Sequence, residues 1–72
     1  MDINYNESTD LLYIRLDNKQ QKVINKQIAE DIVLDINKDD KPVGIEILNA
    51  SRRINLENLF PLKYKVFRKA VS

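Results

Sequence analysis

The sequence predicts a strand-dominated α+β domain, in which an antiparallel β-meander of four to five strands is followed by a short C-terminal helical segment. Over the first 50 residues, apolar side chains recur at every second position, which is the period of a strand with one buried face. Polar runs rich in Asn, Asp and Ser separate these alternating stretches, as turns do. From residue 49 onward, apolar residues recur at helical spacing instead. We therefore divide the chain into a β-meander body, residues 1–50, and a basic helical or irregular segment, residues 51–72.

Two strands are predicted at the start of the chain. Ile3 and Tyr5 stand two positions apart, and in residues 12–16 apolar side chains alternate with Tyr13 and Arg15. The polar run between these strands ends at Asp10, which we expect to cap the turn before the second strand.

Residues 21–30 are harder to assign. Val23, Ile24 and Ile28 could form a short helical stripe, whereas a strand with the two isoleucines inward would bury Lys26 unless a bulge intervenes. We favour a strand, because the stretch joins two strands and carries no helix cap or stop signal.

A β-hairpin is the clearest prediction. When two alternating runs are aligned across the polar loop 37–42, six apolar side chains fall on one face. A shift of one residue would destroy that match, so the sequence specifies the register. The predicted pairs are Ile36–Val43, Leu34–Ile45 and Ile32–Ile47. Gly44 lies on the opposite face, where it either admits a neighbouring side chain such as Tyr13 or is a tolerated strand glycine.

The same hairpin carries oxygen-bearing residues at calcium-loop spacing. Asp35, Asn37, Asp39 and Glu46 match positions one, three, five and twelve of an EF-hand loop. However, strands flank the loop, Asp40 stands where glycine is usual, and Glu46 lies about 10 Å up its strand, so it cannot close over the loop. We predict a polar turn and no metal site, although a weak cation site confined to the loop stays open.

The composition argues against catalysis. The chain has no histidine and no cysteine, which removes the commonest general base, nucleophile and metal ligands. Carboxylates are the only acid–base groups, and Asp10, Asp35 and Glu46 are more often solvated or turn-forming than catalytic. We therefore predict no enzyme activity, no catalytic residue and no cofactor.

Residues 51–72 are strongly basic. They hold one acidic and six basic residues, whereas residues 1–50 hold ten acidic and six basic ones. Asn49 or Asn55 could cap a helical turn here, Pro61 interrupts it, and residues 62–71 could be strand or helix. The candidate interaction residues are Arg52, Arg53, Lys63, Tyr64, Lys65, Phe67, Arg68 and Lys69. They could bind phosphates and stack on bases, but we favour packing of the apolar ones on the body or a second subunit.

Several of these residues together resemble a known family. The hairpin strings Asp31–Asp35 and Val43–Ser51, and the earlier Asp10–Leu16, are similar to the prokaryotic domain of unknown function numbered 2283. The resemblance covers about residues 3–52, and its motif positions here are Asp10, Tyr13, Asp35, Gly44 and Glu46. It implies a small strand-rich domain with a short helical end and brings no activity. It also implies a toxin-like protein partner, because some members sit beside small toxin-like proteins.

Size sets the remaining expectations. A chain of 72 residues without disulfides often gains stability by pairing with a second copy, so we expect a homodimer. The chain has no apolar run long enough to cross a bilayer and no signal peptide, so we expect a cytoplasmic protein. The leading hypothesis is a non-catalytic protein-interaction module, with a nucleic-acid-binding or autoregulatory protein and a weak divalent-cation binder as alternatives.

Overall fold

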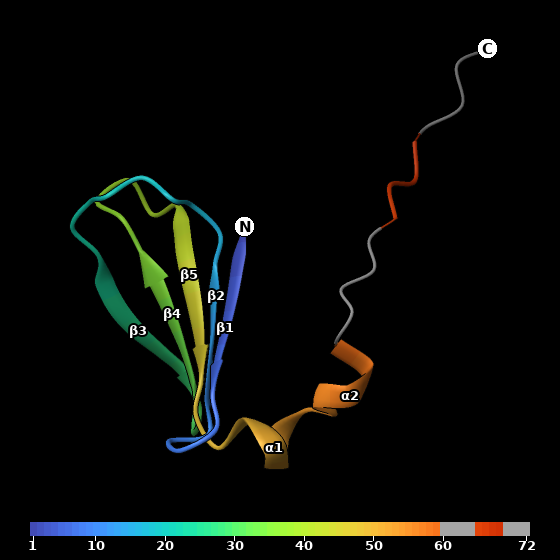
Figure 1. Cartoon of the computed structure of the whole chain (residues 1–72). Helices are drawn as coiled ribbons and strands as arrows, with labels where there is room; N and C mark the ends of the chain where they lie inside the picture. Colours follow the sequence, from blue (N-terminus) through green and yellow to red (C-terminus); the bar gives the residue numbers. More distant parts are fainter. Residues whose placement is uncertain (60–64, 69–72) are drawn as a thin grey trace.

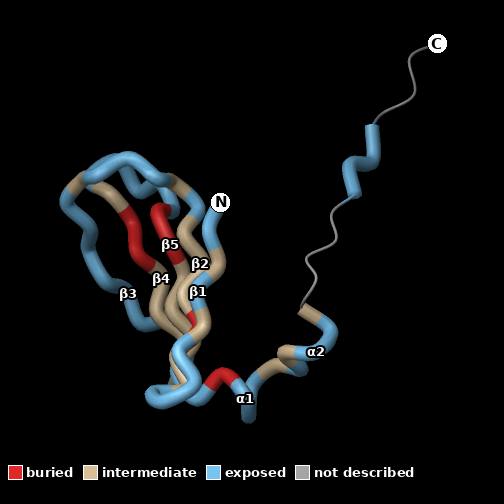
Figure 2. The backbone as a smooth tube through the Cα atoms, viewed as in Figure 1, coloured by how far each residue is buried: buried red, intermediate tan, exposed pale blue. Residues whose placement is uncertain are grey.

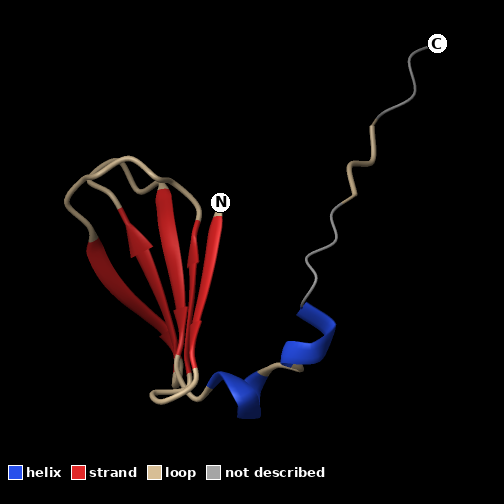
Figure 3. Cartoon of the chain, in the orientation of Figure 1, coloured by secondary structure: helices blue, strands red, loops and turns tan. Residues whose placement is uncertain are grey.

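One antiparallel sheet forms the body of the protein (Figures 1 and 3). A computed structural model describes residues 1–59 and 65–68 of the chain. The strands are β1 (Asp2–Asn6), β2 (Leu11–Arg15), β3 (Ile24–Ala29), β4 (Ile32–Ile36) and β5 (Pro42–Ile47), and the helices are α1 (Ala50–Arg53) and α2 (Leu56–Leu59). Neighbouring strands are antiparallel throughout. The predicted strand-dominated α+β class is therefore confirmed.

The strands lie in the order β1-β2-β5-β4-β3, so the connection from β2 to β3 skips two places. In an uninterrupted meander, β2 and β3 would be neighbours; here β5 returns between β2 and β4. The side chains explain the arrangement. Ile45 of β5 pairs with Ile14 on one side and Leu34 on the other, whereas β3 carries Lys26 and Gln27. Charged and polar side chains suit an edge strand, because they discourage further pairing.

The β4–β5 hairpin has the predicted register in its centre. Leu34 pairs with Ile45, but Ile36 pairs with Pro42 and not with Val43 as predicted. The register shifts between Asp35 and Ile36, and the carbonyl of Val43 accepts the amide protons of Leu16 and Asp17 at 2.8 and 3.1 Å. Because Val43 bonds to the chain leaving β2, it drops out of the hairpin ladder as the extra residue of a bulge.

The strand favoured over residues 21–30 is confirmed as β3, from Ile24 to Ala29. The register shifts between Gln27 and Ala29, so a bulge intervenes. Lys26 is exposed, because β3 forms an edge of the sheet and nothing in the described part of the chain covers it. Lys26 therefore stays in water for two reasons: β3 is an edge strand, and the bulge shifts its register.

Helical spacing after residue 49 produces two helices of four residues each. Both lie beyond one end of the sheet, and neither lies over it (Figures 1 and 3). Asn55 accepts the amide proton of Glu57 at 3.1 Å and so caps α2, whereas Asn49 makes no side-chain cap bond at α1. Pro61 and most of residues 62–71 lie outside the described residues. No helix in the described ranges is long and apolar enough to span a membrane.

The core is small. The buried apolar residues are Leu12, Ile36, Val43 and Ala50, and Leu12 is the one large side chain fully buried within the described residues (Figure 2). Buried positions lie on β2, β4, β5 and the first residue of α1, while β3 is exposed along its whole length. Such a core leaves much of the sheet dependent on other contacts.

Candidate functional site

Tyr13 and Gly44 meet on the polar face of the sheet. Tyr13 pairs with Glu46, and Arg15 pairs with Gly44, so the Tyr13 ring crosses diagonally above the glycine. A Cβ at position 44 would lie 2.7 Å from Tyr13 Cζ, too close for any real side chain. The close approach expected at Gly44 is thus made by Tyr13. Because glycine has no side chain, the Tyr13 hydroxyl can pass over position 44 and reach β4.

Asp35 receives that hydroxyl. Its carboxylate accepts from Tyr13 Oη at 3.4 Å and from Asn25 Nδ2 at 2.5 Å, and the residue is only 5 % exposed. The solvated state expected for this acid is therefore wrong. The physical reason is that Asn25 reaches it from the neighbouring strand β3 and Tyr13 reaches it across β5 from β2, so both supply the hydrogen bonds that a buried carboxylate needs.

Glu46 lies close to Asp35, diagonally across the hairpin as predicted. Burial raises the pKa of the Glu46 carboxyl, and the charge of Asp35 and a hydrogen bond with it raise it further. Burial, followed by the charge of Asp35, likewise raises the pKa of Tyr13. The Arg15 guanidinium lies 5.7 Å from the Tyr13 ring centroid and adds a cation to this polar-face cluster.

Asp10 joins the β1–β2 turn to α1. Its carboxylate accepts from Tyr5 Oη at 2.7 Å, from the Ser51 amide at 3.0 Å and from Ser51 Oγ at 2.7 Å. The bond from the Ser51 hydroxyl, followed by those from Tyr5 and the Ser51 amide, lowers the pKa of Asp10. Asp10 also adopts a left-handed φ of 56°, and its carbonyl accepts the Ala50 amide. The contact with Ser51 goes beyond the turn-capping role expected of Asp10, because the two residues are 41 positions apart and no local spacing signals it.

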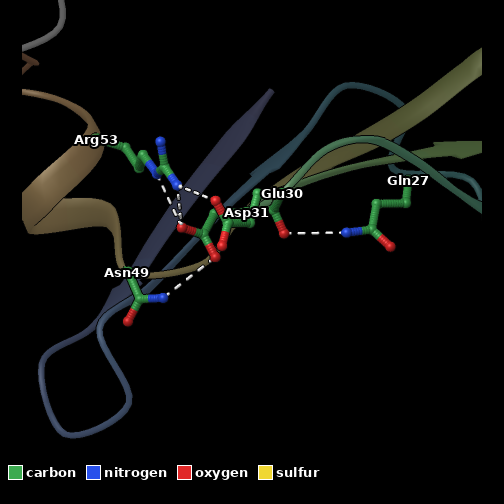
Figure 4. A network of polar contacts seen from close by, with 5 residues as sticks. All are labelled: Gln27, Glu30, Asp31, Asn49 and Arg53. Carbon is green, nitrogen blue, oxygen red and sulfur yellow. Dashed lines mark hydrogen bonds and ion pairs between the residues drawn. The ribbon is translucent and has the colours of Figure 1, made fainter.

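Asp31 holds the other side of α1 (Figure 4). Arg53 pairs with it at 2.7 Å and with Glu30 at 3.3 Å, and Asn49 donates to it at 3.2 Å. The hydrogen bond from Arg53 lowers the pKa of Asp31 and raises that of Arg53. Arg53, a candidate interaction residue in the sequence, therefore serves to fix α1 against the β3–β4 turn.

The hairpin loop with calcium-like spacing is closed by its own asparagine. Asn37 Oδ1 accepts the amide protons of Asp39 at 2.9 Å and Lys41 at 3.0 Å. Asp40 has a φ of 60°, the left-handed conformation that an EF-hand also uses at this place, but Glu46 belongs to β5. Within residues 1–59 and 65–68, no three Asp or Glu side chains gather in a way that could hold a metal ion.

The remaining candidate interaction residues lie on the C-terminal segment. Arg52 is exposed at the surface of α1, and Lys65 Nζ lies 5.8 Å from the ring centroid of Phe67, which is 88 % exposed. Arg68 is exposed as well. Lys63, Tyr64 and Lys69 lie outside the described residues. The structure therefore presents cationic and aromatic side chains together within residues 65–68.

Comparison with known proteins identifies one family. The family model described as "Protein of unknown function (DUF2283)" matches residues 2–51, which include all five strands and the start of α1. No curated protein and no solved structure matches the chain.

Proposed function

Because this chain belongs to the DUF2283 family of proteins of unknown function, we propose its role from its own surfaces: it is a small non-catalytic module that binds another protein through its basic C-terminal segment. The observation that carries this proposal is Phe67, a residue that is 88 % exposed and lies beside the cation of Lys65. A large exposed aromatic ring next to a cation is typical of residues that become buried when a partner binds.

Charge indicates the nature of the partner. Residues 51–72 carry six basic residues against one acidic residue, and the body carries the opposite excess. An acidic surface on another protein would be attracted to this segment and would be steered toward it during encounter. A small toxin neutralised by this chain fits the description, so the specific form of the proposal is an antitoxin-like role.

The test is co-purification with the product of the neighbouring gene. We expect a complex that weakens with added salt, because exposed charges are screened. The triple variant Arg52→Gln, Lys65→Gln and Arg68→Gln should weaken binding roughly tenfold or more. The control replaces Lys22, Lys38 and Lys41 on the body, which makes the same change in net charge. Equal loss in both variants, or no complex with the wild-type chain, would contradict the proposal.

Nucleic acid is the second candidate partner, favoured by the same pairing of Lys65 with Phe67. Cations neutralise phosphates and aromatic rings stack on bases. In this case the chain binds DNA or RNA probes at low salt, and the triple variant lowers the slope of log affinity against log salt by roughly two to three. No retention of any probe at low salt excludes this candidate. We propose no cation site in the hairpin loop, because the Asn37 oxygen is already bonded to two amides.

A further inference from the structure

The sheet has one apolar face, formed by three central strands. The cross-strand pairs Leu12–Ile47 and Ile14–Ile45 continue into β4 as Ile47–Ile32 and Ile45–Leu34, so these side chains lie on the same side of the sheet. We call this surface the apolar sheet face: Leu12, Ile14, Ile32, Leu34, Ile45 and Ile47. It extends onto β1 through Ile3 and onto β3 through Ile24.

This face is not covered within the described part of the chain. Leu12 is buried, but the other five residues of the face are only half-buried, and Ile24 at its margin is 59 % exposed. Both helices lie beyond the end of the sheet (Figure 1). An uncovered face of branched aliphatic side chains marks a surface that becomes buried against something else.

The apolar sheet face spans the width of the sheet. With Ile3 and Ile24 at its margins it covers all five strands, and every one of its side chains except Leu12 is half-buried or exposed. A standard interface takes about 800 Å² from each partner, so a partner that covers this face must meet the sheet across its whole width.

Charge indicates which occupant suits this face. Its centre carries no charged side chain, and the nearest one in the pairing register, Lys26, lies on the edge strand β3. A neutral aliphatic surface of this kind is complementary to itself, which is what a two-fold interface requires. The apolar residues of segment 51–72 are the competing occupant of this face, and the test below distinguishes the two.

We propose that a second copy of this chain packs its apolar sheet face against this one, forming a two-layer β-sandwich homodimer. The two sheets stand about 10 Å apart, as in other sandwiches, and the side chains of β2, β4 and β5 interdigitate. The polar faces with Tyr13 and Asp35 then point outward on both sides. This interface uses the sheet and no residue of segment 51–72, so the dimer does not depend on the proposed partner binding.

Two single-cysteine variants test this arrangement. The natural chain has no cysteine, so Leu34→Cys and Val33→Cys each introduce one thiol, at adjacent half-buried positions on opposite faces of β4. Sedimentation equilibrium first measures the mass of the wild-type chain as a function of concentration. The rate of alkylation is then measured for each variant across the same range.

We expect twice the chain mass at high concentration. The thiol at position 34 should react about tenfold more slowly once nine chains in ten are dimeric, while the thiol at position 33 should keep its rate. Three results would overturn the proposal: a monomer at every concentration, a monomer in which position 34 is already protected, or a dimer in which both thiols react alike. The second would mean that the chain's own C-terminal segment covers the face, and the third that dimerisation uses another surface. A wild-type dimer that binds no partner would leave this inference intact and would contradict only the proposed function.

Discussion

The Tyr13 ring occupies the space that a side chain at position 44 would need, and its hydroxyl group donates to Asp35 on the next strand but one. Gly44 is buried, and it is the only glycine in the chain. Three strands are thus linked on the polar face by one aromatic side chain that crosses a glycine.

Gly44→Ala should destabilise the protein by about 1–3 kcal/mol, because the added methyl group overlaps the Tyr13 ring. Urea unfolding measures the loss. In a Tyr13→Ala background the same change should be neutral or stabilising, since alanine is ordinarily better than glycine within a strand. An equal loss in both backgrounds would show that the ring does not set the cost.

Glu46 should make stability fall as pH rises. Its raised pKa means that the folded protein holds this proton more tightly than the unfolded chain does, so stability declines as pH rises from the ordinary pKa of glutamate through the raised one. Glu46→Gln should remove that decline and raise the urea midpoint at neutral pH. Glu57→Gln, at an exposed position of α2, is the control and should leave the decline in place. A wild-type profile that is flat or rising across this range would be the contrary result.

Asp10 should act in the opposite direction. Its bonds to Ser51 and Tyr5 lower its folded-state pKa, so the stability they contribute is complete above the ordinary pKa of aspartate and is lost as pH falls through the lowered one. Ser51→Ala should move the Asp10 pKa back toward its ordinary value, as measured by carboxyl NMR titration. Ser8→Ala, which removes a hydroxyl bonded only to Asn6, should not move the pKa.

Replacing Arg53 should destabilise α1, whereas replacing Arg52 should weaken partner binding. Arg53→Gln removes the contacts with Asp31 and Glu30, so the Ile54 amide, whose bond to Ala50 closes α1, should exchange faster. Arg52→Gln should leave that exchange rate unchanged and reduce binding of the partner protein. The opposite assignment of effects would show that Arg53 faces the partner.

The alternation of apolar and polar residues was enough to predict much of the fold. Leu34–Ile45 and Ile32–Ile47 follow from the sequence because strand side chains repeat with a period of two. Pairing of Ile36 with Val43 failed, since the Val43 carbonyl is bonded to the chain leaving β2, a contact that lies outside the hairpin. The strand order was not predicted either. Alternation shows which side chains share a face of a strand, but it does not show which strands lie next to each other.

The polar contacts were the least predictable part. Asp35 looked like a solvated turn acid, and its burial depends on Asn25 and Tyr13, ten and 22 positions away. The Asp10–Ser51 link spans 41 positions. Such contacts arise from tertiary placement, so no spacing in the sequence encodes them. Gly44 was a partial exception, because a strand glycine suggested either close approach by a neighbour such as Tyr13 or a merely tolerated glycine, and the structure shows the first.

The most direct test of the central claim, that two sheets meet through their apolar faces, is an isotope-filtered NOE measurement. Chains with labelled Ile, Leu and Val methyl groups are mixed with unlabelled chains and allowed to exchange. We predict intermolecular NOEs at the methyl groups of Ile14, Leu34 and Ile45 and none at Val33, which lies on the other face. Intermolecular NOEs confined to Val33 or to edge strand β3, or none at all in a sample at high concentration, would contradict the account.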